Sequence, residues 1–183
     1  SPEIGFEKLK HLSFEAIDYF AKVDHQRQLR TGFPEVIWGP GKTPDQIEQI
    51  IRALAVHNPI VMATRIEPDV ADILGDRIPL LHYYPQARIC ALVQSPVQIK
   101  HQGTIGILSA GTADLPVAEE AAITATLCGF QVERLWDVGV AGIHRLLSHR
   151  ALIQTMDVLI VVAGMEGALP SVVAGLVDCP VIG

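Results

Sequence analysis

The stretch VLIVVAGMEGALPS, residues 158–171, joins an unbroken apolar run to a glycine-rich turn. Its first six residues are all apolar and show no alternation, which is typical of a strand buried on both faces. The turn then passes through Gly164 and Gly167 into Pro170, which suits the first turn of a helix. Ligands of open α/β sheets bind at such passages, so the stretch predicts a functional turn. Its one carboxylate, Glu166, is unsuited to contact a phosphate.

The same order of strand, turn and helix recurs from residue 102 onward. Strands are predicted at 104–108, 131–137 and 158–163, helices at 115–128, 141–154 and 168–177, and a last strand from Pro180. Alternating strands and helices with short connections predict an α/β fold with a doubly wound parallel sheet in three layers. Because the carboxyl ends of parallel strands meet at one rim, three turns should lie together there, at 109–116, 137–145 and 164–171.

The chain divides into two expected domains, a smaller α/β domain at 1–101 and a nucleotide-binding core at 102–183. In the first, the expected elements are a helix around 13–23, a polar connection at 24–33, a strand at 34–38, a helix capped by Thr43, strands at 59–64 and 87–93, a helix at 68–74 between them, and a linker at 94–103. The core ends on the short apolar segment PVIG. We therefore expect it to be incomplete at its C-terminus, so that the domain continues beyond Gly183 or a partner completes the sheet.

Composition excludes several classes of protein. The 183 residues are 49% hydrophobic with a net charge of -6, and no basic stripe interleaved with aromatics occurs, which argues against nucleic-acid binding. No window approaches the roughly 18 apolar residues of a membrane span, and the first residues lack a secretory apolar region. A cytoplasmic protein is expected. Cys90, Cys128 and Cys179 show no metal-binding spacing and are interpreted as reduced, buried thiols.

The first turn offers groups that suit a phosphate: Ser109, Gly111, Thr112 and neighbouring backbone N–H groups. Asp114 does not suit that task, because two anions repel each other. Two interpretations of Asp114 stay open. It caps the helix beginning at Leu115, or it also binds sugar hydroxyls or a metal.

The second turn carries His144 and Arg145 at a helix start, and Asp137 at a strand end. Histidine suits proton transfer at neutral pH, and a strand-end carboxylate points toward the ligand crevice. The alternative for His144 and Arg145 is an exposed pair on a surface helix.

The third turn carries Glu166 between Gly164 and Gly167, with Ser171 beyond them. If apolar groups enclosed Glu166, desolvation would raise its pKa and make it a proton acceptor or donor. The alternative is a turn residue facing solvent. In the first domain, Arg27 and Arg30 recur at helical spacing and suit anion binding, the alternative being a solvated helix face.

The three turns resemble those of the purine-biosynthetic aminoimidazole ribonucleotide carboxylase and mutase family. The resemblance covers Ser109–Asp114, the run Gly142, His144 and Arg145, and Gly167–Ser171. It implies a PurE-like, flavodoxin-like fold and, from that family, a homo-oligomer and specifically an octamer. Where the purine enzymes have a proton-shuttling histidine, this sequence has Ala168, with Glu166 two residues earlier. The purine reaction is therefore disfavoured.

A closer and longer resemblance is to the LarB family of nickel-pincer nucleotide cofactor synthesis. It rests on the segments DHQRQLRTGFPEVIWGPGKT, SAGTADLPVAEEAA, DVGVAGIHRLL and VVAGMEGALPSVVAGLVDCPVIG. It implies that nicotinic acid adenine dinucleotide is carboxylated on its pyridinium ring with CO2 or bicarbonate and hydrolysed to release AMP. The product would be pyridinium-3,5-biscarboxylic acid mononucleotide.

The implied chemistry assigns roles to particular residues. A thiolate adds to the ring first, and the resemblance implies that this cysteine follows the strand beginning PVIG, beyond Gly183, so none of the three cysteines here matches it. Glu166 or Asp137 would then remove the ring proton. Phosphoanhydride hydrolysis favours Mg2+, for which Asp114 is the candidate ligand, and no tightly bound organic cofactor is expected. The alternatives are the purine mutase and a nucleotide-binding module without catalysis.

Overall fold

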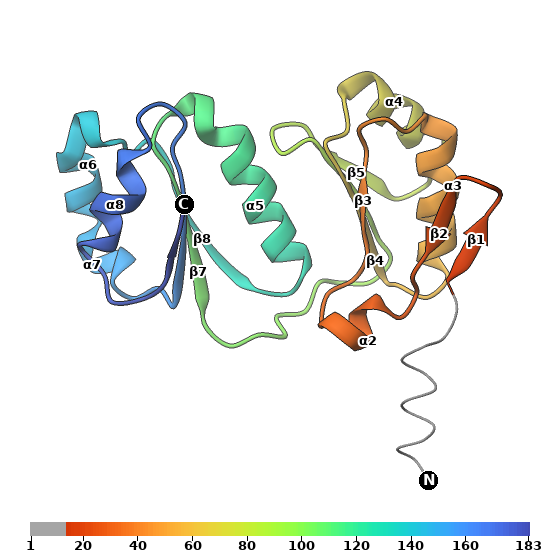
Figure 1. Ribbon diagram of the computed structural model, residues 1–183, viewed down its shortest axis with the longest axis horizontal. Coiled ribbons are helices and arrows are strands. Elements are labelled where there is room, and N and C mark those ends of the chain that lie inside the picture. The colour runs from red at the N-terminus through yellow and green to blue at the C-terminus, as the bar shows by residue number, and fades with distance from the viewer. Residues whose placement is uncertain (1–13) are drawn as a thin grey trace, which may run out of the picture. The chain divides into compact units, whose positions relative to one another are not determined.

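The computed structural model describes residues 14–183 (Figure 1), which divide into two compact units. One runs to Tyr84 and adds Arg88–Pro96, and the other comprises Pro85–Ala87 and Val97–Gly183. The linker expected at 94–103 contains no helix or strand and spans the main division between the units.

The C-terminal unit is built on a parallel sheet of four strands in the order β10-β9-β7-β8. The strands are β7 (Thr104–Ser109), β8 (Gln131–Leu135), β9 (Val158–Val162) and β10 (Val181–Ile182). Figure 1 shows α5 (Leu115–Leu127) on one face, and α6 (Ile143–Ser148), α7 (Arg150–Ile153) and α8 (Ala168–Ala174) on the other. The predicted α/β fold with a doubly wound parallel sheet in three layers is confirmed.

The apolar run in β9 feeds both layers of core. Leu159 and Val161 are buried in the cluster that includes Leu146 and Leu169 from α6 and α8. Ile160 and Val162 pack against the other cluster, which contains Ala118 and Ala122 of α5. Because each face of the strand meets a helix layer, no position in the run is left for a polar residue.

Three elements in this unit differ from the prediction, and one of them, α8, ends at Ala174 rather than at Val177. The helix expected at 141–154 is broken, since a 3-10 turn (η2, Val140–Gly142) precedes α6, and α7 begins only at Arg150. The strand expected at 131–137 ends at Leu135, because Asp137 has a left-handed backbone with φ of 58° that a strand does not accommodate.

The N-terminal unit has a four-stranded sheet in the order β3-β4-β6-β5. Its strands are β3 (Val36–Trp38), β4 (Ile60–Thr64), β5 (Leu81–Tyr84) and β6 (Ile89–Val93), of which β3 and β4 are parallel and the others antiparallel. The helices α3 (Pro44–Ala55) and α4 (Pro68–Arg77) pack on it through one apolar cluster. The Thr43 hydroxyl caps α3 by accepting the Gln46 N–H at 3.2 Å, as predicted.

This unit differs from the prediction in three places. The helix expected at 13–23 is wrong over residues 14–23, while Ser13 lies outside the described residues; an antiparallel hairpin of β1 (Glu15–Ile17) and β2 (Ala21–Val23) stands there instead. Val23 is buried in the core cluster and Ile17 packs against it, so the segment is a short strand pair with few anchors rather than a helix with an apolar stripe. The expected polar connection contains a short helix, α2 (Arg27–Thr31), and β5 was not predicted.

No helix within residues 14–183 has the length and apolar content needed to cross a membrane.

Candidate active site

Three turns meet at the carboxyl-terminal rim of the parallel sheet, as predicted from the strand order. After β7 the chain builds β8 on one side and then returns to place β9 on the other. The strand order therefore reverses between β7 and β9, and ligands of doubly wound sheets bind beyond the strand ends at this point. The turns 109–116 and 164–171 flank it directly.

The side chain of Asp114 forms hydrogen bonds to both of these flanking turns. Its Oδ2 accepts the backbone N–H of Gly111 and its Oδ1 accepts that of Gly164, each at 2.9 Å. The side chain does not cap α5, so the capping interpretation is wrong. The N–H groups of Gly111 and Gly164, which could have cradled a phosphate, are already donating to a carboxylate.

The first and second turns are joined by Ser109 and its neighbour Ala110. The Ser109 carbonyl accepts the Val138 N–H at 3.0 Å, and its hydroxyl oxygen lies 3.4 Å from the donating Asp137 N–H. Ser109 is fully buried, so its hydroxyl faces protein in this chain. That Ser109 binds substrate stays a prediction. The same holds for Thr112, whose side chain is exposed.

Gly139 lets the second turn approach the first closely, a role that the sequence analysis did not assign. Its N–H donates to the Ala110 carbonyl at 2.8 Å, and a Cβ at position 139 would lie 2.7 Å from that oxygen. Such a contact is too short for any side chain. The signal in the sequence was a glycine two residues after a strand-end carboxylate.

The second turn brings two of the predicted residues into contact. Arg145 Nη1 donates to Asp137 Oδ2 in an ion pair, with both side chains partly exposed to solvent. A guanidinium held by one carboxylate still presents its remaining N–H donors to an anion. His144, the neighbouring residue on α6, is exposed.

In the third turn, the side chain of Glu166 is exposed to solvent. Glu166 is exposed, its neighbour Met165 is 96% exposed, and Gly167 turns the chain into α8 with φ of 64°. No apolar groups enclose Glu166 within the described residues of this chain, and the side chain faces solvent, as in the alternative interpretation. Ser171 is also exposed, while Ala168 is half-buried as the first residue of α8.

The three thiols are poor nucleophiles. Cys90 is buried, as interpreted, whereas Cys128 and Cys179 are only partly buried. Burial raises the pKa of Cys90 to about 12 and also raises the pKa values of Cys128 and Cys179. A thiol with a raised pKa holds little thiolate near neutral pH.

The residues described here do not form a recognisable metal site. Within residues 14–183, no group of three His, Cys, Asp or Glu side chains gathers closely enough to hold an ion. Both oxygens of Asp114 also accept N–H groups, so the donor set does not fit Mg2+.

Arg27 and Arg30 lie on α2 in the other unit, before β3. Arg30 donates to both carboxylate oxygens of Asp24, with its Nη1 at 3.0 Å from Oδ1. This hydrogen bond is the main cause that lowers the pKa of Asp24. Arg27 is exposed.

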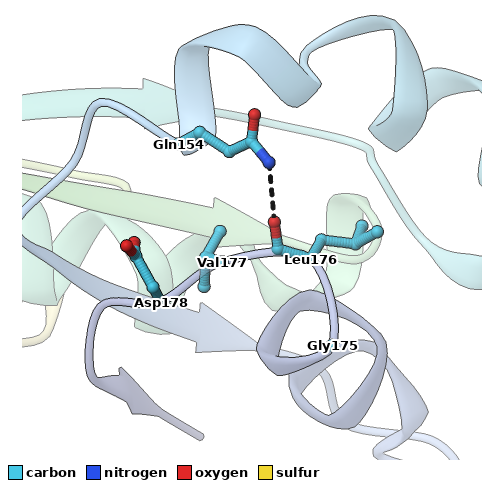
Figure 2. A pocket seen from close by; sticks show the side chains of 5 residues that line it. All are labelled: Gln154, Gly175, Leu176, Val177 and Asp178. Atoms are coloured by element: carbon cyan, nitrogen blue, oxygen red, sulfur yellow. Dashed lines mark hydrogen bonds between the residues drawn. The ribbon is translucent and has the colours of Figure 1, made fainter.

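The C-terminal unit also has a hollow of about 410 Å³ that lies away from this rim (Figure 2). It is lined by Gln154, Gly175, Leu176, Val177 and Asp178, and Gln154 Nε2 donates to the Leu176 carbonyl at 3.0 Å. These residues precede β9 and β10, at the opposite ends of the strands from the three turns. The hollow is therefore not part of the candidate active site.

Comparison with known proteins agrees with this architecture. Residues 14–94 match the family described as LarB/PurE-like N-terminal domain, and residues 104–183 match AIR carboxylase. The chain is 42% identical over 186 residues to the uncharacterized protein MJ0165 of Methanocaldococcus jannaschii, covering 97% of this chain and 72% of that protein.

Fold, rim and matched domains together define a two-domain α/β enzyme of the carboxylase or mutase type, acting on a nucleotide and CO2. More specifically, the chain belongs to the LarB family, in which a LarB-type N-terminal domain precedes a PurE-like domain.

Proposed function

We propose that this protein carboxylates the pyridinium ring of nicotinic acid adenine dinucleotide with CO2 or bicarbonate and hydrolyses the phosphoanhydride. The products are pyridinium-3,5-biscarboxylic acid mononucleotide and AMP. The observation that carries the proposal is Ala168, a methyl group at the start of α8 where the purine enzymes have an imidazole. Without that imidazole the purine reaction lacks its general acid and base.

The ring chemistry needs a temporary nucleophile, because a pyridinium cation does not attack CO2. Addition of a thiolate forms a C–S bond and converts part of the ring to an enamine, whose carbon beta to nitrogen then forms the new C–C bond with CO2. A base removes the proton from that carbon, the thiolate leaves with its electron pair, and aromaticity returns. We assign the nucleophile to none of Cys90, Cys128 and Cys179, because burial raises the pKa of each.

Glu166 is the better candidate for the base. Asp137 is already engaged in an ion pair, because its Oδ2 accepts from Arg145 Nη1. Glu166 has no ion-pair partner within residues 14–183 and stands on the turn beside the reversal point of the sheet. Its exposure in a single chain means that substrate itself, or a second chain, would have to exclude water from it.

Binding of the anionic substrate is assigned to the second and first turns. Arg145 is held by Asp137 with donors left for a phosphate or carboxylate, and His144 precedes it in the first turn of α6. The remaining substrate contacts at the rim are assigned to Gly111, Gly164, Gly167 and Ser171. We also propose that the protein forms a homo-oligomer. Arg27 and Arg30 are proposed to contact the substrate phosphates.

The proposal is tested by incubating the full-length protein with nicotinic acid adenine dinucleotide and 13C-labelled bicarbonate, and analysing the products by mass spectrometry. We expect AMP together with a mononucleotide that has gained a labelled carboxylate. Carboxyaminoimidazole ribonucleotide is offered in a parallel reaction. Turnover of that purine precursor without carboxylation of the dinucleotide would overturn the proposal in favour of the purine mutase.

Binding of the dinucleotide without any product in either reaction would favour the third alternative, a binding module without catalysis. Calorimetry with the same protein sample measures that binding. Boiled protein and a reaction without bicarbonate serve as controls, since the phosphoanhydride can hydrolyse without the enzyme.

A further inference from the structure

Two aspartates at the rim of the parallel sheet differ in how far the protein itself occupies them. Asp114, after β7, accepts a backbone N–H on each of its carboxylate oxygens. Asp137, after β8, accepts from Arg145 on Oδ2, and among residues 14–183 no group forms a hydrogen bond with its Oδ1. The Asp137 side chain is 57% exposed. Of the two carboxylates, Asp137 is therefore the one with an acceptor oxygen left for a ligand.

The connection from β7 through α5 to β8 brings Asp137 next to the first turn. β7 and β8 are neighbouring parallel strands, so their carboxyl ends share one rim. In a strand, helix and strand unit that binds a nucleotide, phosphate lies at the turn after the first strand. An acidic residue at the end of the second strand accepts a hydrogen bond from a ribose hydroxyl. Asp137 occupies that second position, two residues after the last residue of β8.

The backbone at Asp137 is fixed against the first turn. The Asp137 N–H lies 3.4 Å from Ser109 Oγ, and the Val138 N–H donates to the Ser109 carbonyl at 3.0 Å. Asp137 is left-handed with φ of 58°, a conformation that costs energy in a residue other than glycine and persists where neighbouring groups hold it. Ser109 is fully buried, so it is a rigid anchor.

Arg145 reaches Asp137 across Gly142, which has no room for a side chain. A Cβ at position 142 would lie 2.6 Å from Arg145 Nε and 3.0 Å from Nη2. The guanidinium and the carboxylate consequently stand side by side at the rim. Such a pair offers N–H donors to a phosphate and an oxygen acceptor to a hydroxyl, which is the complement of a ribose 5′-phosphate.

We infer that Asp137 is a specificity-determining residue, which accepts a hydrogen bond from a ribose hydroxyl of the nucleotide while Arg145 binds its phosphate. The inference rests on the proposed function for the class of ligand, a 5′-nucleotide. It does not require the carboxylation, because the purine alternative also acts on a ribose 5′-phosphate. Asp137 thereby has a role distinct from that of Glu166, the proposed base.

The test compares nucleotides that differ by one hydroxyl. AMP and nicotinic acid mononucleotide, the two halves of the dinucleotide, are titrated into the full-length protein in a calorimeter, which shows which half binds more tightly. The 2′-deoxy and 3′-deoxy forms of that half are then titrated in the same way. We expect the loss of one of the two hydroxyls to weaken binding by about tenfold or more, because a charged acceptor loses its hydrogen bond.

Asp137→Gly removes the carboxylate from the protein. Glycine adopts a φ of 58° without strain, so the fold should be retained. The ribonucleotide and its deoxy forms should then bind equally. Release of Arg145 changes the affinity of all forms alike, so the ratio of their dissociation constants is the readout. Glu133→Gln, which removes an exposed carboxylate from β8, should keep the tenfold ratio.

Equal binding of the ribonucleotide and both deoxy forms to the wild-type protein would overturn the inference, as would a tenfold ratio that survives Asp137→Gly. Absence of any nucleotide binding would also overturn it. Should Asp137→Gly fail to fold, Asp137→Asn decides in its place, since asparagine tolerates the left-handed backbone. Its neutral oxygen should reduce the ratio to about threefold, and an unchanged ratio would reject the role of Asp137.

Failure of the proposed function gives a different result. A ratio that disappears in Asp137→Gly, in a protein that forms no carboxylated product, would support the inference and reject the reaction. A carboxylated product from a protein whose ratio is unchanged in Asp137→Gly would support the reaction and reject the inference.

Discussion

The carboxylate of Asp114 accepts the backbone N–H of Gly164 at 2.9 Å, although the two residues are separated by 50 positions in the sequence. The same carboxylate accepts the Gly111 N–H, so one side chain connects the turn after β7 with the turn after β9. Glu166 follows Gly164 by two residues. The position of the proposed base relative to the first turn is thus set by a single ionised group.

Asp114→Asn should therefore lower both stability and turnover. The amide retains the shape of the carboxylate but offers one acceptor oxygen where two N–H donors need one each. We expect a loss of about 1–3 kcal/mol in the free energy of unfolding. Denaturant titration and the dinucleotide carboxylation assay measure the two effects.

Asp157→Asn is the matched control for this change. Asp157 Oδ2 accepts the Thr104 N–H at 2.7 Å, at the opposite end of the same strands. Asparagine keeps one acceptor oxygen for this single N–H, so the change should cost less stability than Asp114→Asn and leave turnover of the folded protein unchanged. If both variants lost turnover in proportion to stability, Asp114 would have no positioning role.

Gly139→Ala should destabilise the protein, because its methyl group would lie 2.7 Å from the Ala110 carbonyl oxygen. We expect a loss of about 1–3 kcal/mol, as for other forced contacts in packed regions. Gly111→Ala is the control for stability, since the nearest atom to a Cβ there is Asp114 Oδ2 at 3.8 Å. Equal melting temperatures of the two variants would contradict the close approach of the first and second turns.

Glu166→Gln should abolish carboxylation without affecting the fold. The side chain is exposed, so the free energy of unfolding should change by less than about 0.5 kcal/mol. Loss of a general base lowers the rate by about 10²–10⁴-fold. Glu133→Gln, which removes another exposed carboxylate from β8, should retain full activity. Wild-type turnover in Glu166→Gln would transfer the role to Asp137.

Cys90 should resist alkylation in the folded protein. A pKa of about 12 against an ordinary value of 9.0 leaves about a thousandth of the usual thiolate fraction near neutral pH. Iodoacetamide labelling at pH 8, followed by peptide mass spectrometry, should modify the less buried Cys179 first and all three thiols after denaturation. Equal native rates at Cys90 and Cys179 would contradict the burial of Cys90.

The same raised pKa makes the stability depend on pH in a defined direction. Between pH 9.0 and about 12 the unfolded thiol of Cys90 ionises while the folded thiol stays protonated. The unfolded state then binds fewer protons, so the contribution of Cys90 to stability falls as pH rises. Cys90→Ala should flatten this part of the profile in alkaline denaturation curves.

Most of the C-terminal fold was predictable, because strands alternate with helices there and two of the strands, β7 and β9, are largely apolar runs followed by turns that contain glycine. Residues 158–162 show this best, since both faces of β9 meet helix layers and every position is apolar. The hairpin at the start was not predictable in the same way. Its strands of three residues each are too short to show a period, and their pairing depends on Val23 reaching the core.

The candidate site was predictable as a set of turns but not as a set of contacts. Strand order places the turns on one rim whatever their side chains do. The pairing of Asp137 with Arg145, the double acceptance by Asp114 and the exposure of Glu166 depend on side-chain directions and on distances between strands. None of these follows from spacing along the chain.

For this protein, the sequence by itself determined the repeating strand and helix units, the rim on which the turns meet, and the family, because these depend on local periodicity and on long motifs. The tertiary structure alone decided what the charged groups do. Asp114 became a link between turns, and Arg145 became a partner of Asp137. Hydrogen bonds and ion pairs form only at distances of a few ångström, and only the folded chain brings such distant residues that close.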